Sequence, residues 1–233
     1  MTEIVTYSSS ETHALVTINN GKANAISHKV IDELHNSLDK AQKEHKVVIL
    51  TGTDGIFSGG YDLSIMKKSP KDAIDLVTEG SKLSLRMLQF PLPIIIACNG
   101  HAIAKGAFLL LSTDYRIGTN GPFKIGLNEV LIGMTMHDAG IAIANARLSE
   151  VYLNRSVSNA EIFSPQEAIV AGFLDTIVSQ EELLTTAFKT AKMFSTLNLK
   201  AHAETKLKVR KQHLTAIENA IISDAKKSIT LNV

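Results

Sequence analysis

The sequence predicts a mixed α/β fold in which strands and helices alternate along the chain. Short β-branched apolar runs alternate with segments of helical periodicity, and two of the helices start at recognisable capping residues. No linker rich in Pro, Gly or Ser divides the 233 residues. We therefore expect one domain, with a layered core over about 1–185 and a helical C-terminal region over about 186–233.

Five apolar runs predict strands. The first alternates apolar and polar residues, as a half-buried strand does, whereas the next two are continuously apolar, as in buried strands. The fourth follows a short helix, and the fifth is the one late strand expected in a mainly helical second half. The runs are His13–Ile18, Val47–Thr51, Ile94–Cys98, Tyr115–Gly118 and Leu174–Val178.

Helices are predicted between these strands. Ser27 can cap a helix with apolar positions from Val30 to Ala41 at helical spacing, and Ser69 can cap a second one that begins at Pro70. Ile74, Val77, Leu85 and Leu88 share one face of that second helix. A short helix is expected over 106–112. From 138 onward the chain is mainly helical, and the tail from 185 is rich in Lys and Ala.

Composition narrows the classes of function. The chain is 45% hydrophobic and 20% charged, with a net charge of +1 and no tryptophan, so it lacks the basic field of a nucleic-acid-binding protein. We see no signal peptide and no apolar stretch of the ~18 residues that a membrane span needs. The single cysteine, Cys98, lies in an apolar run and is either a core residue or a catalytic thiol. We expect a cytoplasmic protein.

Two glycine-containing turns, each after a predicted strand, are candidates for binding an oxyanion. They cover 57–63 and 99–107. A turn between a strand and a helix leaves backbone N–H groups free, and glycine lets the backbone approach a ligand closely. Two such turns can aim one N–H each at the same developing negative oxygen.

Glu129 is the candidate acid–base residue. It lies in the apolar run Gly126–Gly133, where a carboxylate is either a capping or surface residue, or a base whose pKa is raised by desolvation. The sequence lacks the motifs of a serine nucleophile and of a metal site. Ser58 does not fit the spacing of a G-x-S-x-G nucleophile elbow, and the histidines show no H-E-x-x-H spacing, so no metal site is predicted.

These segments, in this order, resemble the crotonase superfamily, which includes enoyl-CoA hydratases and isomerases. The similarity covers Phe57–Leu63, the stretch from Pro93 to Arg116, Gly126–Glu129, and Ser164–Ala168 with Ala171–Asp175. The resemblance implies a spiral of β-β-α units with a C-terminal trimerisation region. It also implies homotrimers or hexamers and an acyl-CoA thioester substrate, with no separate cofactor and no partner in nucleic acid or membrane.

The resemblance also assigns roles by position. It makes the backbone N–H groups of Gly59 and Lys105 the oxyanion donors, with lysine where the family usually has glycine, and makes Glu129 the acid–base group. It places coenzyme A along Lys22, Ala23 and Ala25. Further substrate contacts are expected from residues of the first turn and its neighbours: Ser58, Gly60, Tyr61, Asp62, Leu63, Phe108 and Asn128. For Asp62, an N-cap of the following helix is the alternative.

The number of carboxylates bears on the reaction. Family hydratases use two glutamates, and the first of these aligns with Phe108, which has no acid–base chemistry. One carboxylate suits a proton shuttle that moves a double bond. His137 is either a second proton carrier or a polar residue at a helix start. We therefore expect an enoyl-CoA isomerase. An enoyl-CoA hydratase and an acyl-CoA-binding protein with little catalysis are the alternatives.

Overall fold

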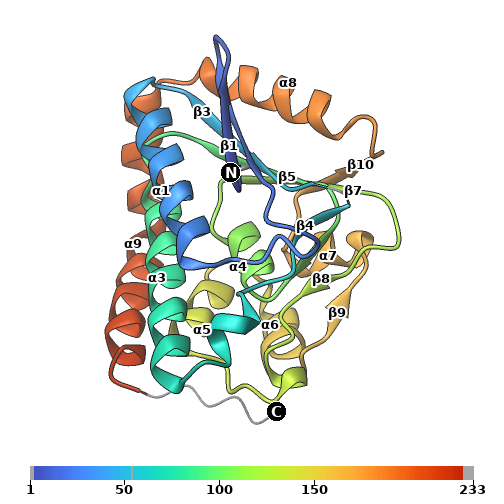
Figure 1. The fold of residues 1–233 in the computed structure, drawn as a ribbon. Helices are drawn as coiled ribbons and strands as arrows, with labels where there is room; N and C mark the ends of the chain where they lie inside the picture. The colour runs from blue at the N-terminus through green and yellow to red at the C-terminus, as the bar shows by residue number, and fades with distance from the viewer. Residues whose placement is uncertain (1–2, 54, 228–233) are drawn as a thin grey trace.

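The computed structural model describes residues 3–53 and 55–227 and contains two sheets (Figure 1). The larger sheet has the strand order β1-β2-β3-β5-β7-β10, in which β1 and β2 are antiparallel and the other neighbours are parallel. Its strands are β1 (Val5–Ser9), β2 (His13–Ile18), β3 (Val47–Thr51), β5 (Ile94–Cys98), β7 (Tyr115–Thr119) and β10 (Thr176–Val178). The five predicted strands are thus confirmed, although the last begins two residues later than expected.

The smaller sheet has the order β4-β6-β8-β9. Its strands are β4 (Ile56–Ser58), β6 (His101–Ile103), β8 (Ile125–Gly126) and β9 (Ile162–Phe163). Each of β3, β5 and β7 in the larger sheet is followed by a strand of the smaller sheet and then by a helix. This succession is the expected spiral of β-β-α units. The strands of the smaller sheet are two or three residues long, too short for a periodicity of two to reveal them in the sequence.

The predicted helix starts are confirmed. Ser27 caps α1 (His28–Lys43) by accepting from the N–H of Val30, and Ser69 caps α3 (Pro70–Gln89) by accepting from the N–H of Asp72. The buried face of α3 differs from the prediction. Ile74 and Leu85 are only half-buried, because the helix turns a face rich in small residues toward the protein. The remaining helices before the tail are α2 (Leu63–Met66), α4 (Lys105–Leu111), α5 (Asp138–Asn145), α6 (Glu150–Val157) and α7 (Pro165–Ala171).

The C-terminal region consists of α8 (Leu183–Ser195) and α9 (Leu199–Asp224). Figure 1 shows α8 lying across the larger sheet and α9 running along α3. Leu183, Ala187 and Ala191 of α8 pack on Val47 and Ile49 of β3, whereas Val48 and Leu50 of the same strand join the core on its other side. The strand is therefore buried on both faces, which explains its unbroken apolar sequence.

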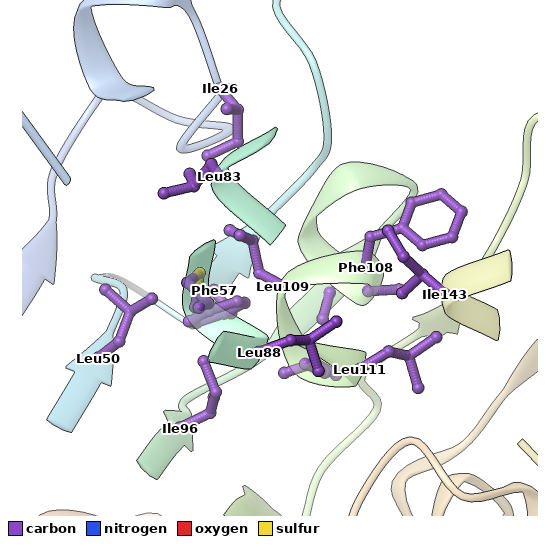
Figure 2. Packing of buried hydrophobic residues seen from close by; sticks show 14 of the residues in the cluster. Ile26, Leu50, Phe57, Leu83, Leu88, Ile96, Phe108, Leu109, Leu111 and Ile143 are labelled. Carbon is purple, nitrogen blue, oxygen red and sulfur yellow. The ribbon is translucent and has the colours of Figure 1, made fainter. Parts of the chain in front are cut away.

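The main core lies between the larger sheet and the helices. Figure 2 shows part of it, where Leu109 and Leu111 of α4 meet side chains of α3 and the sheet. Cys98 is buried there, as expected of a core residue, and burial raises the pKa of its thiol to about 12. Within residues 3–53 and 55–227, no helix is long and apolar enough to cross a membrane.

Candidate active site

The three candidate segments come together because each follows one of three adjacent parallel strands. Strands β4, β6 and β8 are neighbours in the smaller sheet, with β4 parallel to β6 and β6 parallel to β8. Carboxyl ends of parallel strands lie at one edge of a sheet, which is where ligands bind in open α/β sheets. The loop after β4, the start of α4 and the segment around Glu129 therefore share one edge.

A cavity of about 110 Å³ opens at this edge. Its wall is mostly apolar, with one carboxylate, one imidazole and one carboxamide among the lining groups. Such a lining suits an apolar ligand that is oriented by a few polar contacts. The lining residues are Gly59, Tyr61, Leu63, Met66, Val77, Ala104, Asn128, Glu129, Ile132, Met134 and His137.

The first loop offers a different N–H group from the one predicted. The N–H of Gly59 donates to the carbonyl oxygen of Ala23 at 2.8 Å, so the assignment of Gly59 as an oxyanion donor is wrong. The N–H of Gly60 donates to the Ser58 hydroxyl, and that of Asp62 donates to the Ile26 carbonyl. In the part of the chain that the structure describes, the Tyr61 N–H has no hydrogen-bond acceptor, and Tyr61 lines the cavity.

The second N–H group is at the position expected. Lys105 is the first residue of α4, and among residues 3–53 and 55–227 its N–H has no acceptor. Ala104 before it has a φ of 52°, an unusual value for a residue with a side chain. Gly60 lets the two loops approach, since a Cβ at Gly60 would lie 3.5 Å from the Lys105 nitrogen and 2.9 Å from the Ala104 Cβ.

Glu129 is a buried carboxylate on the cavity wall. It directly precedes the 3-10 turn η1 (Val130–Ile132), and only 4% of its surface is exposed. Its Oε2 atom is buried and has no hydrogen-bond partner among the described residues. Burial without a partner disfavours the charged form and raises the pKa of Glu129 to about 7. A carboxyl group with this pKa can take up and release a proton near neutral pH.

His137 lines the cavity, whereas Phe108 does not. Phe108 is 1% exposed, and its ring packs edge-on against the His137 ring with 5.5 Å between the centroids. Phe108 is thus not among the residues that line the cavity, but it contacts one of them, His137. Desolvation, and then the charge of Lys105, lower the pKa of His137 to about 4, so its ring is neutral at physiological pH.

Of the other residues predicted to contact substrate, some line the cavity and others make hydrogen bonds within the fold. Asn128 lines the cavity, and its Oδ1 atom is buried with no partner among the described residues. Leu63 is 52% exposed at the cavity. Asp62 is the N-cap of α2, accepting from the N–H of Ser64 at 2.9 Å. Ser58 is fully buried and donates to the carbonyl of Asn24, so it is a structural residue instead of a substrate contact.

The predicted coenzyme A segment lies beside the first loop. Lys22 and Ala23 are exposed and Ala25 is half-buried. Asn24 between them is fully buried, has a φ of 42° and donates from its side chain to the carbonyl of Ile56 at 3.1 Å. This buried asparagine, which holds the segment against β4, was not singled out in the sequence.

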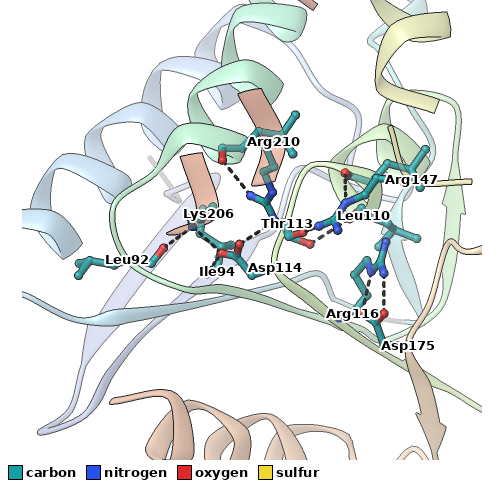
Figure 3. A network of polar contacts seen from close by, with 12 residues as sticks. Leu92, Ile94, Leu110, Thr113, Asp114, Arg116, Arg147, Asp175, Lys206 and Arg210 are labelled. Atoms are coloured by element: carbon teal, nitrogen blue, oxygen red, sulfur yellow. Dashed lines mark hydrogen bonds and ion pairs between the residues drawn. The ribbon is translucent and has the colours of Figure 1, made fainter. Parts of the chain in front are cut away.

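Two basic residues of the tail prove to be internal. Lys206 and Arg210 each lie 2.9 Å from Asp114, which also accepts from the N–H of Ile94 (Figure 3). They therefore anchor α9 to the core. In the described ranges, no group of three or more His, Cys, Asp or Glu side chains is arranged to hold a metal ion.

Known proteins are similar to this chain in sequence and in fold. The family model for enoyl-CoA hydratase/isomerase matches residues 8–228. The chain is 31% identical over 207 residues to human mitochondrial enoyl-CoA delta isomerase 1, covering 85% of this chain and 67% of the relative. It is 30% identical over 165 residues to a probable enoyl-CoA hydratase of Bacillus subtilis strain 168, covering 69% of this chain and 64% of the relative.

A crystal structure of a Pseudomonas syringae protein of the enoyl-CoA hydratase/isomerase family is also similar. It superposes with a TM-score of 0.95 at 54% identity, covering 97% of this chain and 98% of that chain. The family match and this superposition both extend over almost the whole chain, and the family match includes every segment that forms the cavity. The chain therefore belongs to the enoyl-CoA hydratase/isomerase family.

Proposed function

We propose that the protein is an enoyl-CoA isomerase that moves a double bond in an unsaturated acyl-CoA. The observation that carries this proposal is that Glu129, with a pKa of about 7, is the one carboxylate on the cavity wall among the described residues. Adding water calls for two groups that hold and activate it, whereas moving a proton along an acyl chain needs one group that accepts it and returns it. Human enoyl-CoA delta isomerase 1 is among the similar proteins.

The proposed reaction is a proton shuttle. Glu129 removes a proton from the carbon next to the thioester carbonyl of a 3-enoyl-CoA. The electrons of that C–H bond delocalise onto the thioester oxygen and give a dienolate. The backbone N–H groups of Tyr61 and Lys105, which have no other acceptor among the described residues, donate to that oxygen. Glu129 then returns the proton two carbons further along, leaving a 2-enoyl-CoA.

An enoyl-CoA hydratase is the second candidate. It is favoured by the similarity to a probable hydratase and by the neutral imidazole of His137, which could hold a water molecule opposite Glu129.

We place coenzyme A beside Lys22, Ala23 and Ala25, where the exposed residues adjoin the loop that carries Tyr61. The third possibility is a protein that binds acyl-CoA with little catalysis. It does not explain why a carboxylate with a raised pKa lies on the cavity wall.

Supplying the purified protein separately with 3-hexenoyl-CoA and 2-hexenoyl-CoA tests the proposal. We expect conversion of 3-hexenoyl-CoA to 2-hexenoyl-CoA, and slower or no formation of 3-hydroxyhexanoyl-CoA, with products separated by chromatography. Faster hydration than isomerisation would identify a hydratase instead. Binding of both thioesters without turnover would identify a binding protein.

We also propose that the chain assembles into trimers or hexamers through its C-terminal region. Several apolar side chains of α8 and α9 are well exposed, among them Met193 at 58% and Val209 at 75%. Val209 lines a groove of about 680 Å³ beside α9, and burying these apolar side chains against a second copy is favourable. Light scattering at micromolar concentration should give three or six times the mass of the chain. A monomer mass would contradict the proposal.

A further inference from the structure

A lysine is buried beside the cavity without a carboxylate partner. Lys105 is 1% exposed, and its ammonium donates to the Gly80 carbonyl at 2.5 Å and to the Ser84 hydroxyl at 2.6 Å. Across residues 3–53 and 55–227, no carboxylate lies within ion-pair distance of this ammonium. Lys206, by contrast, is paired with Asp114. Burying a cation against a carbonyl and a hydroxyl alone is costly, and here it lowers the pKa of Lys105 to about 7.

The same turn of α3 also seats the side chain of Tyr61. A Cβ on Gly80 would lie 2.2 Å from the Tyr61 hydroxyl oxygen, so only glycine at this position leaves room for the ring. The Tyr61 hydroxyl reaches the carbonyl of Val77 one turn earlier, and the Lys105 ammonium lies 5.9 Å from the centre of the Tyr61 ring. Gly80 thus contacts both residues whose backbone N–H groups have no acceptor among the described residues, and Ser84 adds a second contact to Lys105.

We propose that the Lys105 side chain is a positioning residue for the oxyanion site, because it ties the first turn of α4 to the turn of α3 that also seats Tyr61. This inference rests on the proposed function. The ammonium holds the first turn of α4 against Gly80 of α3, against which the Tyr61 ring also packs, and so fixes the distance between the two N–H donors. Its charge also has the sign that favours a negative oxygen at those donors.

The decisive variant is Lys105→Met, which keeps the backbone N–H and nearly the length of the side chain. The probe is 2,4-hexadienoyl-CoA, whose absorption moves to longer wavelength when N–H donors polarise its thioester carbonyl. We expect Lys105→Met to bind the probe within about threefold of wild type, to lose most of the absorption shift, and to isomerise 3-hexenoyl-CoA with a kcat lower by about 10²-fold. Its melting temperature should be equal or higher, because a costly buried charge is removed.

Two further variants sharpen the test. Ser84→Ala removes one of the two acceptors and keeps the lysine, so an intermediate loss of absorption shift and of kcat is expected. It also tests the inference if Lys105→Met does not fold. Lys40→Met is the matched control, because Lys40 also lies over a tyrosine ring, 4.2 Å from that of Tyr7, but is exposed and remote from the cavity. We expect it to behave as wild type.

The outcomes separate this inference from the proposed function. If wild type shifts the probe and both Lys105→Met and Ser84→Ala shift it equally, Lys105 has no positioning role. A lower melting temperature with a normal shift and a normal kcat likewise overturns the inference, because the role is then one of stability alone. If wild type binds the probe with no shift and no turnover, the oxyanion site and the proposed function are both wrong.

Discussion

Replacing Glu129 with glutamine should lower kcat for 3-hexenoyl-CoA by about 10²–10⁴-fold, the range for loss of a positioned acid–base group. Glutamine keeps the shape of the side chain but cannot accept a proton from carbon. Binding of the thioester should remain, because Glu129 is one of many lining residues. The matched control is Glu204→Gln, an exposed glutamate of α9, which should retain wild-type kcat. Near-normal turnover in Glu129→Gln would exclude this residue as the base.

Glu129→Gln should lower kcat but raise the free energy of unfolding near neutral pH. The folded-state pKa of Glu129 is about 7, against an ordinary value of 4.5. Between these values the folded protein binds more protons than the unfolded chain, so the free energy of unfolding falls as pH rises through this window. At 1.36 kcal/mol per pKa unit, the ionised carboxylate costs up to about 3 kcal/mol above pH 7. Glu129→Gln should therefore gain stability relative to wild type as pH rises from 5 to 8, measured by urea unfolding.

The rate should follow the same titration. Only the ionised form of Glu129 can accept the proton from carbon, so kcat/KM should rise as pH increases from 5 toward 7, where Glu129 ionises. The Lys105 ammonium loses its charge with a pKa of about 7, so kcat/KM should fall again at higher pH. His137 does not contribute to this rise, because its pKa is about 4. A rate that is flat between pH 5 and pH 8 would show that Glu129 ionises at its ordinary pKa or is not the base.

Asp114→Asn should lower the free energy of unfolding by about 3–5 kcal/mol, the usual effect of removing one partner from a buried ion pair. The side chain of Asp114 is 8% exposed and accepts from Lys206 and Arg210, which are themselves largely buried (Figure 3). Asparagine can still accept from the Ile94 N–H, but it leaves two cations of α9 without a counter-charge. The attachment of α9 to the core should weaken, and urea unfolding measures the loss.

An exposed ion pair provides the control for Asp114. Asp39 pairs with Arg86 on the surface, where 67% of the Asp39 side chain is exposed. Asp39→Asn should cost no more than about 1 kcal/mol, because solvent screens the pair. A loss of this small size in Asp114→Asn would mean that Asp114 contributes little net stability. Hydrogen exchange should show the destabilisation concentrated in α9, and uniform exchange would argue against a local role.

Local patterns in the sequence predicted much of the fold. The five longer apolar runs form strands, and the capping residues Ser27 and Ser69 start helices, because these features depend on neighbours a few residues apart. The order of the motifs also predicted the site, since Glu129 and the two glycine-containing turns line one cavity. Strands β4, β6, β8 and β9 escaped prediction because two or three residues carry no periodicity.

The sequence by itself determined the fold class and the family and singled out Glu129 as a candidate, because each depends on residue types and their order. Only the tertiary structure decided which groups face the cavity. The N–H of Gly59 donates to Ala23, whereas that of Tyr61 has no acceptor among the described residues. His137, and not Phe108, is among the residues that line the cavity. The burial of Lys105 and the pairing of Asp114 with Lys206 of α9 also became evident only in the tertiary structure. These outcomes depend on contacts between residues far apart in the chain, such as the one that joins Lys105 to Gly80.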